Sequence, residues 1–254
     1  MNDVSELFWN ATVEEIKHGY IYDDAAEEYI CLVCGTRFMK GVIYSEEDVF
    51  YEAGKFAKLH LARAHTSMFD YLLSLDKKLT GLTEHQKMLI NYFYQGRSDA
   101  EIVKELDGGS TSTIRNHRFT LREKAKQAKV FLAIMDLAEA KTGKQEKFIS
   151  VHRTATMLDE RYAITEQENE EIIAKYFENE GGGKLLEFPK KEKRKIAILK
   201  HVMKRFEPNK KYTEKEVNSV LKAVYDDYVT LRRYLIDYGF MERTSGGSAY
   251  WVKV

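Results

Sequence analysis

The chain of 254 residues contains only two cysteines, Cys31 and Cys34, in the stretch "YICLVCGTRF". Two histidines follow, His60 and His65, and 25 residues separate Cys34 from His60. Two thiolates and two imidazoles form a closed tetrahedral set suited to Zn²⁺. Residues five apart on a regular helix differ by about 140°, so we expect a widened turn near a helix end to bring both imidazoles to one ion. The pattern predicts one structural zinc ion per chain.

Other interpretations of the cysteine pair stay open at this point. A redox pair would be expected within a βαβ context, and none surrounds these cysteines. Two buried thiols beside two surface histidines would need no metal at all. A protease-type zinc site is disfavoured further, because the sequence has no His-Glu-x-x-His and four protein ligands leave no position for water.

Composition indicates a helix-rich globular chain. Pro189 and Pro208 are the only prolines, and 31% of the residues are charged. No apolar run approaches the roughly 20 residues of a membrane span. The acidic, amphipathic start is unlike a signal peptide, so we predict a cytoplasmic protein without membrane contact, in which a disulfide would be unusual.

A formal net charge of zero conceals four blocks of alternating sign. Residues 1–80 carry a net −6, residues 81–145 carry +3, residues 146–189 carry −5 and residues 190–254 carry +8. Contacts with a polyanion are therefore expected on the two basic blocks.

The first basic block predicts a helix that begins after Thr83, where Gln86 completes a capping box, and ends at Gly96. Its expected apolar face consists of Met88, Leu89, Tyr92 and Phe93.

A second helix is expected after Ser98, followed by a turn at 107–109 whose glycines allow positive φ, and a basic helix that begins at Ser110. A short helix, a glycine-bearing turn and a basic helix predict a helix-turn-helix, whose second helix enters the major groove of DNA.

About 50 residues of this segment resemble the DNA-binding domain of the LuxR/GerE family of bacterial regulators. The elements that carry the resemblance are Leu82-Thr83, then Gly96, Ser98, Glu101 and Ile102, then Thr113-Ile114-Arg115-Asn116-His117. The resemblance implies transcription regulation through double-stranded DNA. In this family, the last helix of the domain often supports dimerisation.

Within the recognition helix, Ile114 and Leu121 are seven residues apart and are expected to face the core. Arginine can pair with guanine, asparagine with adenine, and phenylalanine can touch a thymine methyl group, whereas lysines suit phosphates. The predicted DNA-binding residues are Ser110, Thr111, Ser112, Arg115, Asn116, Arg118, Phe119, Arg122 and Lys126.

The stretch "VFLAIMDLAEAKTG" is expected to continue or follow this helix. It supplies either a homodimer surface or domain core, from Leu132, Ile134, Met135 and Ala138. A polar cluster follows without an assignable chemistry: His152, Arg153, Asp159, Glu160 and Arg161.

We predict a mainly α, multidomain protein. A zinc module occupies residues 1–79, the helix-turn-helix residues 80–142, a helical connector and mobile linker residues 143–189, and a small winged-helix-like domain residues 190–254. The last domain is expected to contain three helices and a short β-hairpin around Gly246-Gly247.

The last domain resembles a domain of uncharacterised function known as DUF2087, through "YTEKEVN", "TLRRYLIDYGFMERT" and the terminal "YW". Its charge suggests a second surface for DNA or a protein partner. The candidate residues are Lys210, Lys211, Thr230, Arg232, Arg233 and Arg243. One of the two adjacent arginines is expected to point inward, toward Asp226 or Asp237.

These features favour a sequence-specific DNA-binding transcription regulator with structural zinc, acting as a homodimer on a two-fold site. The alternative is an adaptor whose acidic zinc module docks RNA polymerase or another protein without reading DNA. No Ser-His-Asp order, phosphate loop or open metal triad is visible, so we do not expect an enzyme.

Overall fold

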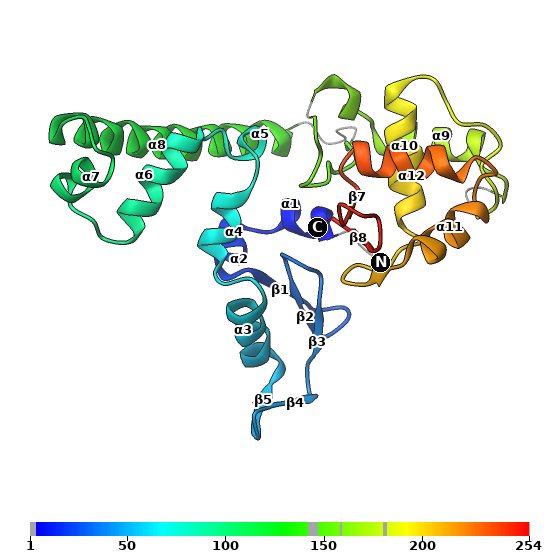
Figure 1. The fold of residues 1–254 in the computed structure, drawn as a ribbon, viewed down its shortest axis with the longest axis horizontal. Helices are drawn as coiled ribbons and strands as arrows, with labels where there is room; N and C mark the ends of the chain where they lie inside the picture. Colours follow the sequence, from blue (N-terminus) through cyan, green and yellow to red (C-terminus); the bar gives the residue numbers. More distant parts are fainter. Residues whose placement is uncertain (1–3, 142–146, 158, 180–181, 254) are drawn as a thin grey trace. The chain divides into compact units, whose positions relative to one another are not determined.

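The computed structural model describes all residues except 1–3, 142–146, 158, 180–181 and 254. It is mainly helical, with three small antiparallel sheets among the described residues (Figure 1). The chain forms two compact units, residues 77–146 and residues 1–76 together with 147–254, and each is described by itself.

Residues 1–76 form a small mixed module. Two short helices precede a three-stranded meander, a two-stranded hairpin and two further helices (Figure 1). The elements are α1 (Val4–Asn10), α2 (Val13–His18), β1 (Tyr20–Asp23), β2 (Glu28–Cys31), β3 (Arg37–Met39), β4 (Ile43–Glu46), β5 (Val49–Glu52), α3 (Ala53–Ala64) and α4 (Met68–Ser74). Helix α3 packs on β2 and β3.

The sequence has helical periodicity from Ser45 onward, but the helix begins only at α3. Before it, β4 and β5 pair through a turn at Glu47 and Asp48, both with positive φ. The opposed Tyr44 and Tyr51 explain the difference, because cross-strand aromatic pairs stabilise strands and Tyr44 also stacks on Phe56 of α3.

Residues 77–146 form a helical unit with a core of three fully buried or nearly buried residues, Leu89, Ile102 and Ile114. One comes from each of the three longer helices. The helices are α5 (Lys77–Thr80), α6 (Glu84–Tyr94), α7 (Asp99–Glu105) and α8 (Thr111–Lys141).

The predicted helix boundaries of this unit are present. Thr83 and Ser98 each form a capping box, with Gln86 and Glu101 respectively. At the end of α6, Gly96 (φ +75°) donates its amide to Phe93 and the next amide bonds Tyr92, a Schellman motif.

Two details of the unit differ from the sequence prediction. Met88, expected on the apolar face, is 38% exposed, and Lys87 is buried beside it with its ammonium on Glu84. At the end of α7 the left-handed residue is Asp107, whereas Gly108 has no positive φ.

Helix α8 runs unbroken for 31 residues and therefore joins the expected recognition helix and the apolar stretch after it. Ile114 is its only buried residue among those described. The apolar side chains beyond residue 129 are exposed and do not form the core of the helical unit: Val130, Phe131, Leu132, Ile134, Met135 and Leu137.

Residues 147–254 build the largest core of the protein. Its elements are a short 3₁₀ helix (Glu160–Tyr162), α9 (Glu166–Tyr176), α10 (Glu192–Met203), β6 (Lys211–Tyr212), α11 (Glu214–Lys222), α12 (Tyr228–Asp237), β7 (Met241–Arg243) and β8 (Tyr250–Val252). The three strands form one sheet in the order β6-β8-β7, and Gly247 has φ +67° in the expected hairpin turn.

The stretch expected as a mobile linker instead contributes to this core. Phe177 and Leu185 are buried, and the Leu185 amide bonds the Val224 carbonyl at 2.8 Å. Residues 180–181 of the expected linker, like the predicted boundary at 142–143, lie outside the described residues. Apolar side chains on either side of the glycines explain why the segment packs.

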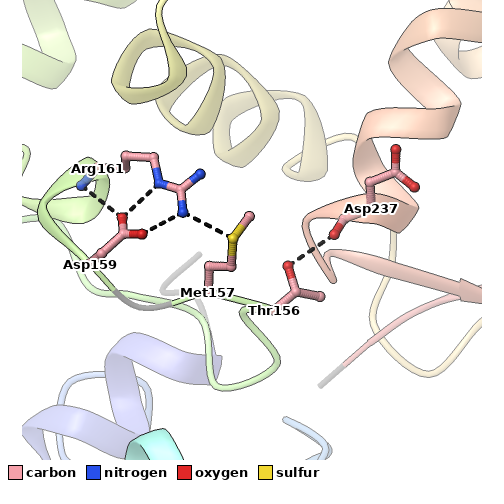
Figure 2. A network of polar contacts seen from close by, with 5 residues as sticks. All are labelled: Thr156, Met157, Asp159, Arg161 and Asp237. Atoms are coloured by element: carbon pink, nitrogen blue, oxygen red, sulfur yellow. Dashed lines mark hydrogen bonds and ion pairs between the residues drawn. The ribbon is translucent and has the colours of Figure 1, made fainter.

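The segment before the 3₁₀ helix is tied to the end of α12 (Figure 2). Thr156 donates its hydroxyl to the Asp237 carbonyl at 2.9 Å. Beside it, the Arg161 guanidinium bonds the Asp159 carboxylate and the Met157 sulfur. Two members of the polar cluster in the sequence thus stabilise a loop.

Among the described residues, no helix combines the length and apolar character that crossing a bilayer requires.

Candidate functional site

The structure brings Cys31, Cys34, His60 and His65 together, with their ligand atoms all within 4.8 Å of one another. Cys31 ends β2, and Cys34 lies in the turn that follows. His60 lies within α3, and His65 is its C-cap residue, at the helix end where the spacing required it. The Cys34 sulfur lies 3.1 Å from Nε2 of His60.

The turn between the cysteines, residues 31–34, is held in one conformation by its backbone. Leu32 donates its amide to the Gly19 carbonyl at 2.9 Å, and Gly35 donates to Cys31 at 2.8 Å. Gly35 has φ +76°, and a Cβ there would lie 2.5 Å from a methyl group of Val4. We call this turn the knuckle.

Electrostatics within the group favour one thiolate. A hydrogen bond from Cys31, opposed by burial and reinforced by His60, lowers the pKa of the Cys34 thiol. The same hydrogen bond, together with burial, raises the pKa of Cys31. A bound metal ion would therefore displace the Cys31 proton, because a thiolate and not a thiol is the ligand.

The donor set fits a metal ion. Both cysteines are buried, and both histidines are half-buried. In the described part of the chain, Nε2 of His65 is buried without a hydrogen-bond partner, which a metal bond would satisfy. Two sulfur and two nitrogen ligands complete a tetrahedral shell, so the site can stabilise structure but has no open position for a substrate.

The predicted DNA-binding residues extend from Ser110, directly before α8, to Lys126 in its fifth turn. Arg115, Asn116, Phe119 and Arg122 are exposed, and Phe119 retains 62% of its surface. Thr111 and Ser112 are exposed in the first turn.

Some residues of the predicted set have structural contacts, among them Ser110, Arg118 and Lys126. The Ser110 hydroxyl accepts the Thr113 amide at 3.2 Å and so caps α8. Arg118 bonds Asp99 at 2.9 Å and covers the Phe93 ring at 3.8 Å, which fastens α8 to α6 and α7. Lys126 pairs with Glu123 at 2.6 Å but remains exposed.

The candidate residues of the C-terminal domain are not equivalent. Arg232 points inward and bonds Glu214 at 2.6 Å, and it also bonds Asn218, rather than Asp226 or Asp237. Its neighbour Arg233 is exposed, with Asp237 at 3.6 Å.

The other four candidates lie at the surface or near it. Lys210 bonds Glu207 at 2.8 Å, Lys211 lies over the Trp251 ring, Thr230 is half-buried in α12, and Arg243 is exposed at the end of β7. Arg232 therefore holds α12 to α11, and the other four basic candidates leave their charged groups accessible.

Sequence reasoning missed two residues that contact the knuckle. Arg153, which is 3% exposed, donates to the carbonyls of Leu32 at 2.6 Å and Val33 at 3.0 Å. Asn209 donates to the Cys34 carbonyl at 2.7 Å. Their partners lie more than 100 residues away, so no local pattern marks them, although Arg153 stood out within an unexplained polar cluster.

Comparison with known proteins identifies only the C-terminal domain. Residues 184–252 match the family model described as "Uncharacterized protein conserved in bacteria (DUF2087)". No curated protein matches the chain, and no solved structure does. The DUF2087 resemblance is thereby confirmed for these residues, whereas the LuxR-type resemblance and the presence of zinc stay predictions.

Proposed function

We propose that the protein is a sequence-specific DNA-binding transcription regulator with one structural Zn²⁺ ion. The observation that carries DNA binding is the division of α8 into two sides. Ile114 anchors one side in the core of the helical unit, and Arg115, Asn116, Phe119 and Arg122 are exposed on the other. Short α7, a tight turn and α8 have the order of a helix-turn-helix, which presents such a side to the major groove.

Zinc is the ion that best suits the four side chains. Cys31, Cys34, His60 and His65 would hold it, and the ion would supply a fixed tetrahedral crosslink between the knuckle and α3. A module with so few buried residues has a small core, and structural metals commonly stabilise such modules.

The exposed apolar end of α8 supports a homodimer. Val130, Ile134 and Leu137 recur at spacings of four and three on one side of the helix, as in a short coiled-coil seam. Ile134→Glu should dissociate such a dimer, which sedimentation velocity would detect. A monomeric wild type at DNA-binding concentrations would refute this part of the proposal.

The C-terminal domain supports a second regulatory surface. Its order α10-β6-α11-α12-β7-β8, with β8 between the other strands, is that of a winged helix. Winged helices bind either DNA or proteins. The partner of this domain must therefore be identified by experiment rather than from its topology.

The test of DNA reading compares a double variant with a matched control. Arg115→Ala/Arg122→Ala should abolish selection of specific genomic fragments, because direct base contacts carry specificity. Lys175→Ala, an exposed charge on α9, should leave selection intact. Unchanged fragment selection by the double variant would refute DNA reading by α8.

The adaptor function is the second candidate, and a specific surface favours it. The β4–β5 hairpin exposes Ile43, Val49 and Phe50 within an acidic module. Such a surface suits a basic, apolar protein partner and would repel DNA. Absence of fragment selection by the wild-type protein would favour this function.

A further inference from the structure

We propose that Arg153 and Asn209 are positioning residues for the metal centre, and that they couple metal loading to the seating of residues 147–254 on residues 1–76. The inference rests on the metal site proposed above and adds the regulation of that site. The two regions belong to one compact unit, and both residues act on the knuckle rather than on the ligands' side chains.

Arg153 holds the two residues between the cysteine ligands. One guanidinium nitrogen, Nη1, lies 2.6 Å from the Leu32 carbonyl, and the other, Nη2, lies 3.0 Å from the Val33 carbonyl. Nη1 also bonds the Tyr71 hydroxyl, and the guanidinium lies 4.8 Å from the centre of the Phe8 ring. A rigid fork on consecutive carbonyls fixes the direction of both peptide planes.

Asn209 holds the second cysteine, Cys34, although the two residues are 175 positions apart in the sequence. Its side-chain amide lies 2.7 Å from the Cys34 carbonyl and 3.4 Å from the Thr36 hydroxyl. That hydroxyl lies 3.1 Å from the Cys34 sulfur. Asn209 occupies the left-handed region at φ +66°, in the turn before β6, so its amide is presented by the C-terminal domain.

These contacts link two equilibria. A metal ion fixes Cys31 and Cys34, which keeps the three knuckle carbonyls where the Arg153 and Asn209 donors require them. Conversely, the buried Arg153 donors, which would lose their acceptors, oppose any rearrangement of an empty knuckle. Coupling between two binding equilibria is reciprocal, so metal should strengthen the seating as much as seating strengthens metal binding.

A different contact between the same regions supplies a matched control. Trp9 donates its indole N–H to the Val151 carbonyl at 2.8 Å, a hydrogen bond in which no knuckle residue takes part. Trp9→Phe removes this hydrogen bond and keeps an aromatic ring. If the C-terminal region stabilised the module only by general packing, this variant and the knuckle variants would affect the metal alike.

The experiment measures Co²⁺ and Zn²⁺ affinity of the full chain by competition with a chelator. Outer contacts of metal ligands typically contribute about 10–100-fold in affinity. Arg153→Met should lower affinity within this range and shift the Co²⁺ absorption bands, and Arg153→Lys should restore part of it. Asn209→Gly keeps the left-handed backbone, removes the amide and should lower affinity less. Trp9→Phe should change affinity little.

Hydrogen exchange on the same proteins measures the converse effect, that of the metal on the seating of residues 147–254. Chelation of the wild type should expose amides near Arg153 and Asn209, and this response should shrink in Asn209→Gly. A wild type that binds no metal refutes the metal site itself. Folded knuckle variants with wild-type affinity overturn the coupling and leave the site standing. If Arg153→Met does not fold, Asn209→Gly decides.

Discussion

The metal module, residues 1–76, and the helical unit, residues 77–146, are of similar length but are held together differently. The module has two small clusters of buried residues, one of which includes both cysteines. The helical unit joins three helices at Leu89, Ile102 and Ile114 and secures their ends by caps. The fold of residues 1–76 therefore depends on a few side chains that are distant in sequence. The fold of residues 77–146 depends on helix signals that are local in sequence.

Loss of a metal ligand should have the largest effect and should separate the two regions. Cys34→Ser removes a thiolate, and folding coupled to a structural zinc is worth about 10–16 kcal/mol in small modules. We expect zinc content to fall to near zero and amides of residues 20–65 to lose hydrogen-exchange protection. Amides of α6 and α7 in the same sample should keep theirs. Loss of protection in both regions would show that they fold as one unit.

A core truncation in the helical unit should produce the converse result. Ile102 is fully buried, so Ile102→Ala should cost about 2–5 kcal/mol of unfolding free energy for residues 77–146. Urea unfolding followed by circular dichroism would measure the loss, and zinc content should stay at the wild-type level. A fall in zinc content would contradict the independence of the two regions.

Substitutions on the exposed side of α8 should alter DNA binding. They should change neither the stability of residues 1–76 nor that of residues 77–146. Arg115→Ala should weaken the preferred site by about 1–3 kcal/mol and relax its sequence preference, as expected for a base contact. Lys126→Ala should weaken binding to all DNA sequences evenly. It should also lower the slope of log affinity against log salt concentration by about one. Binding titrations at several salt concentrations distinguish the two. Equal losses on all sequences for Arg115→Ala would assign it to a phosphate instead.

Removal of one helix cap should have the smallest effect. The Ser98 hydroxyl accepts the Glu101 amide, so Ser98→Ala should cost about 1 kcal/mol. Hydrogen bonds from Ser98 lower the pKa of Glu101, so the carboxylate stabilises the cap above its ordinary pKa, and this contribution disappears as pH falls through the lowered value. The unfolding free energies of wild type and variant should therefore converge as pH falls. Curves of unfolding free energy against pH that stay parallel would count against the capping box.

Local signals in the sequence predicted local structure well. Thr83 with Gln86, and Ser98 before α7, mark helix starts because their side chains bond amides only three residues away. The Cys31–Cys34 spacing and the position of His65 likewise predicted a ligand group that the structure brings together.

Contacts between distant segments could not be predicted in the same way. The Arg153 bonds to the knuckle span 120 or more residues, and the inward direction of Arg232 depends on Glu214 from a neighbouring helix. The hairpin before α3 was missed because "VFYEAGKF" satisfies helical spacing, whereas its pairing with β4 depends on a turn at Glu47 and Asp48. Burial of Phe177 and Leu185 depends on the surface offered by α10 and α11.

The uninterrupted α8 also acts as a ruler. At about 1.5 Å per residue, its 31 residues span about 46 Å, and Arg115 lies about 28 Å from Ile134 along one rod. In a dimer joined at the apolar end, this distance and the rotation of about 100° per residue together set the spacing and phase of the two DNA half-sites. Inserting a single residue between those positions would turn one end by more than a quarter of a revolution, so in the proposed dimer the length of this helix would help to determine which DNA sites fit.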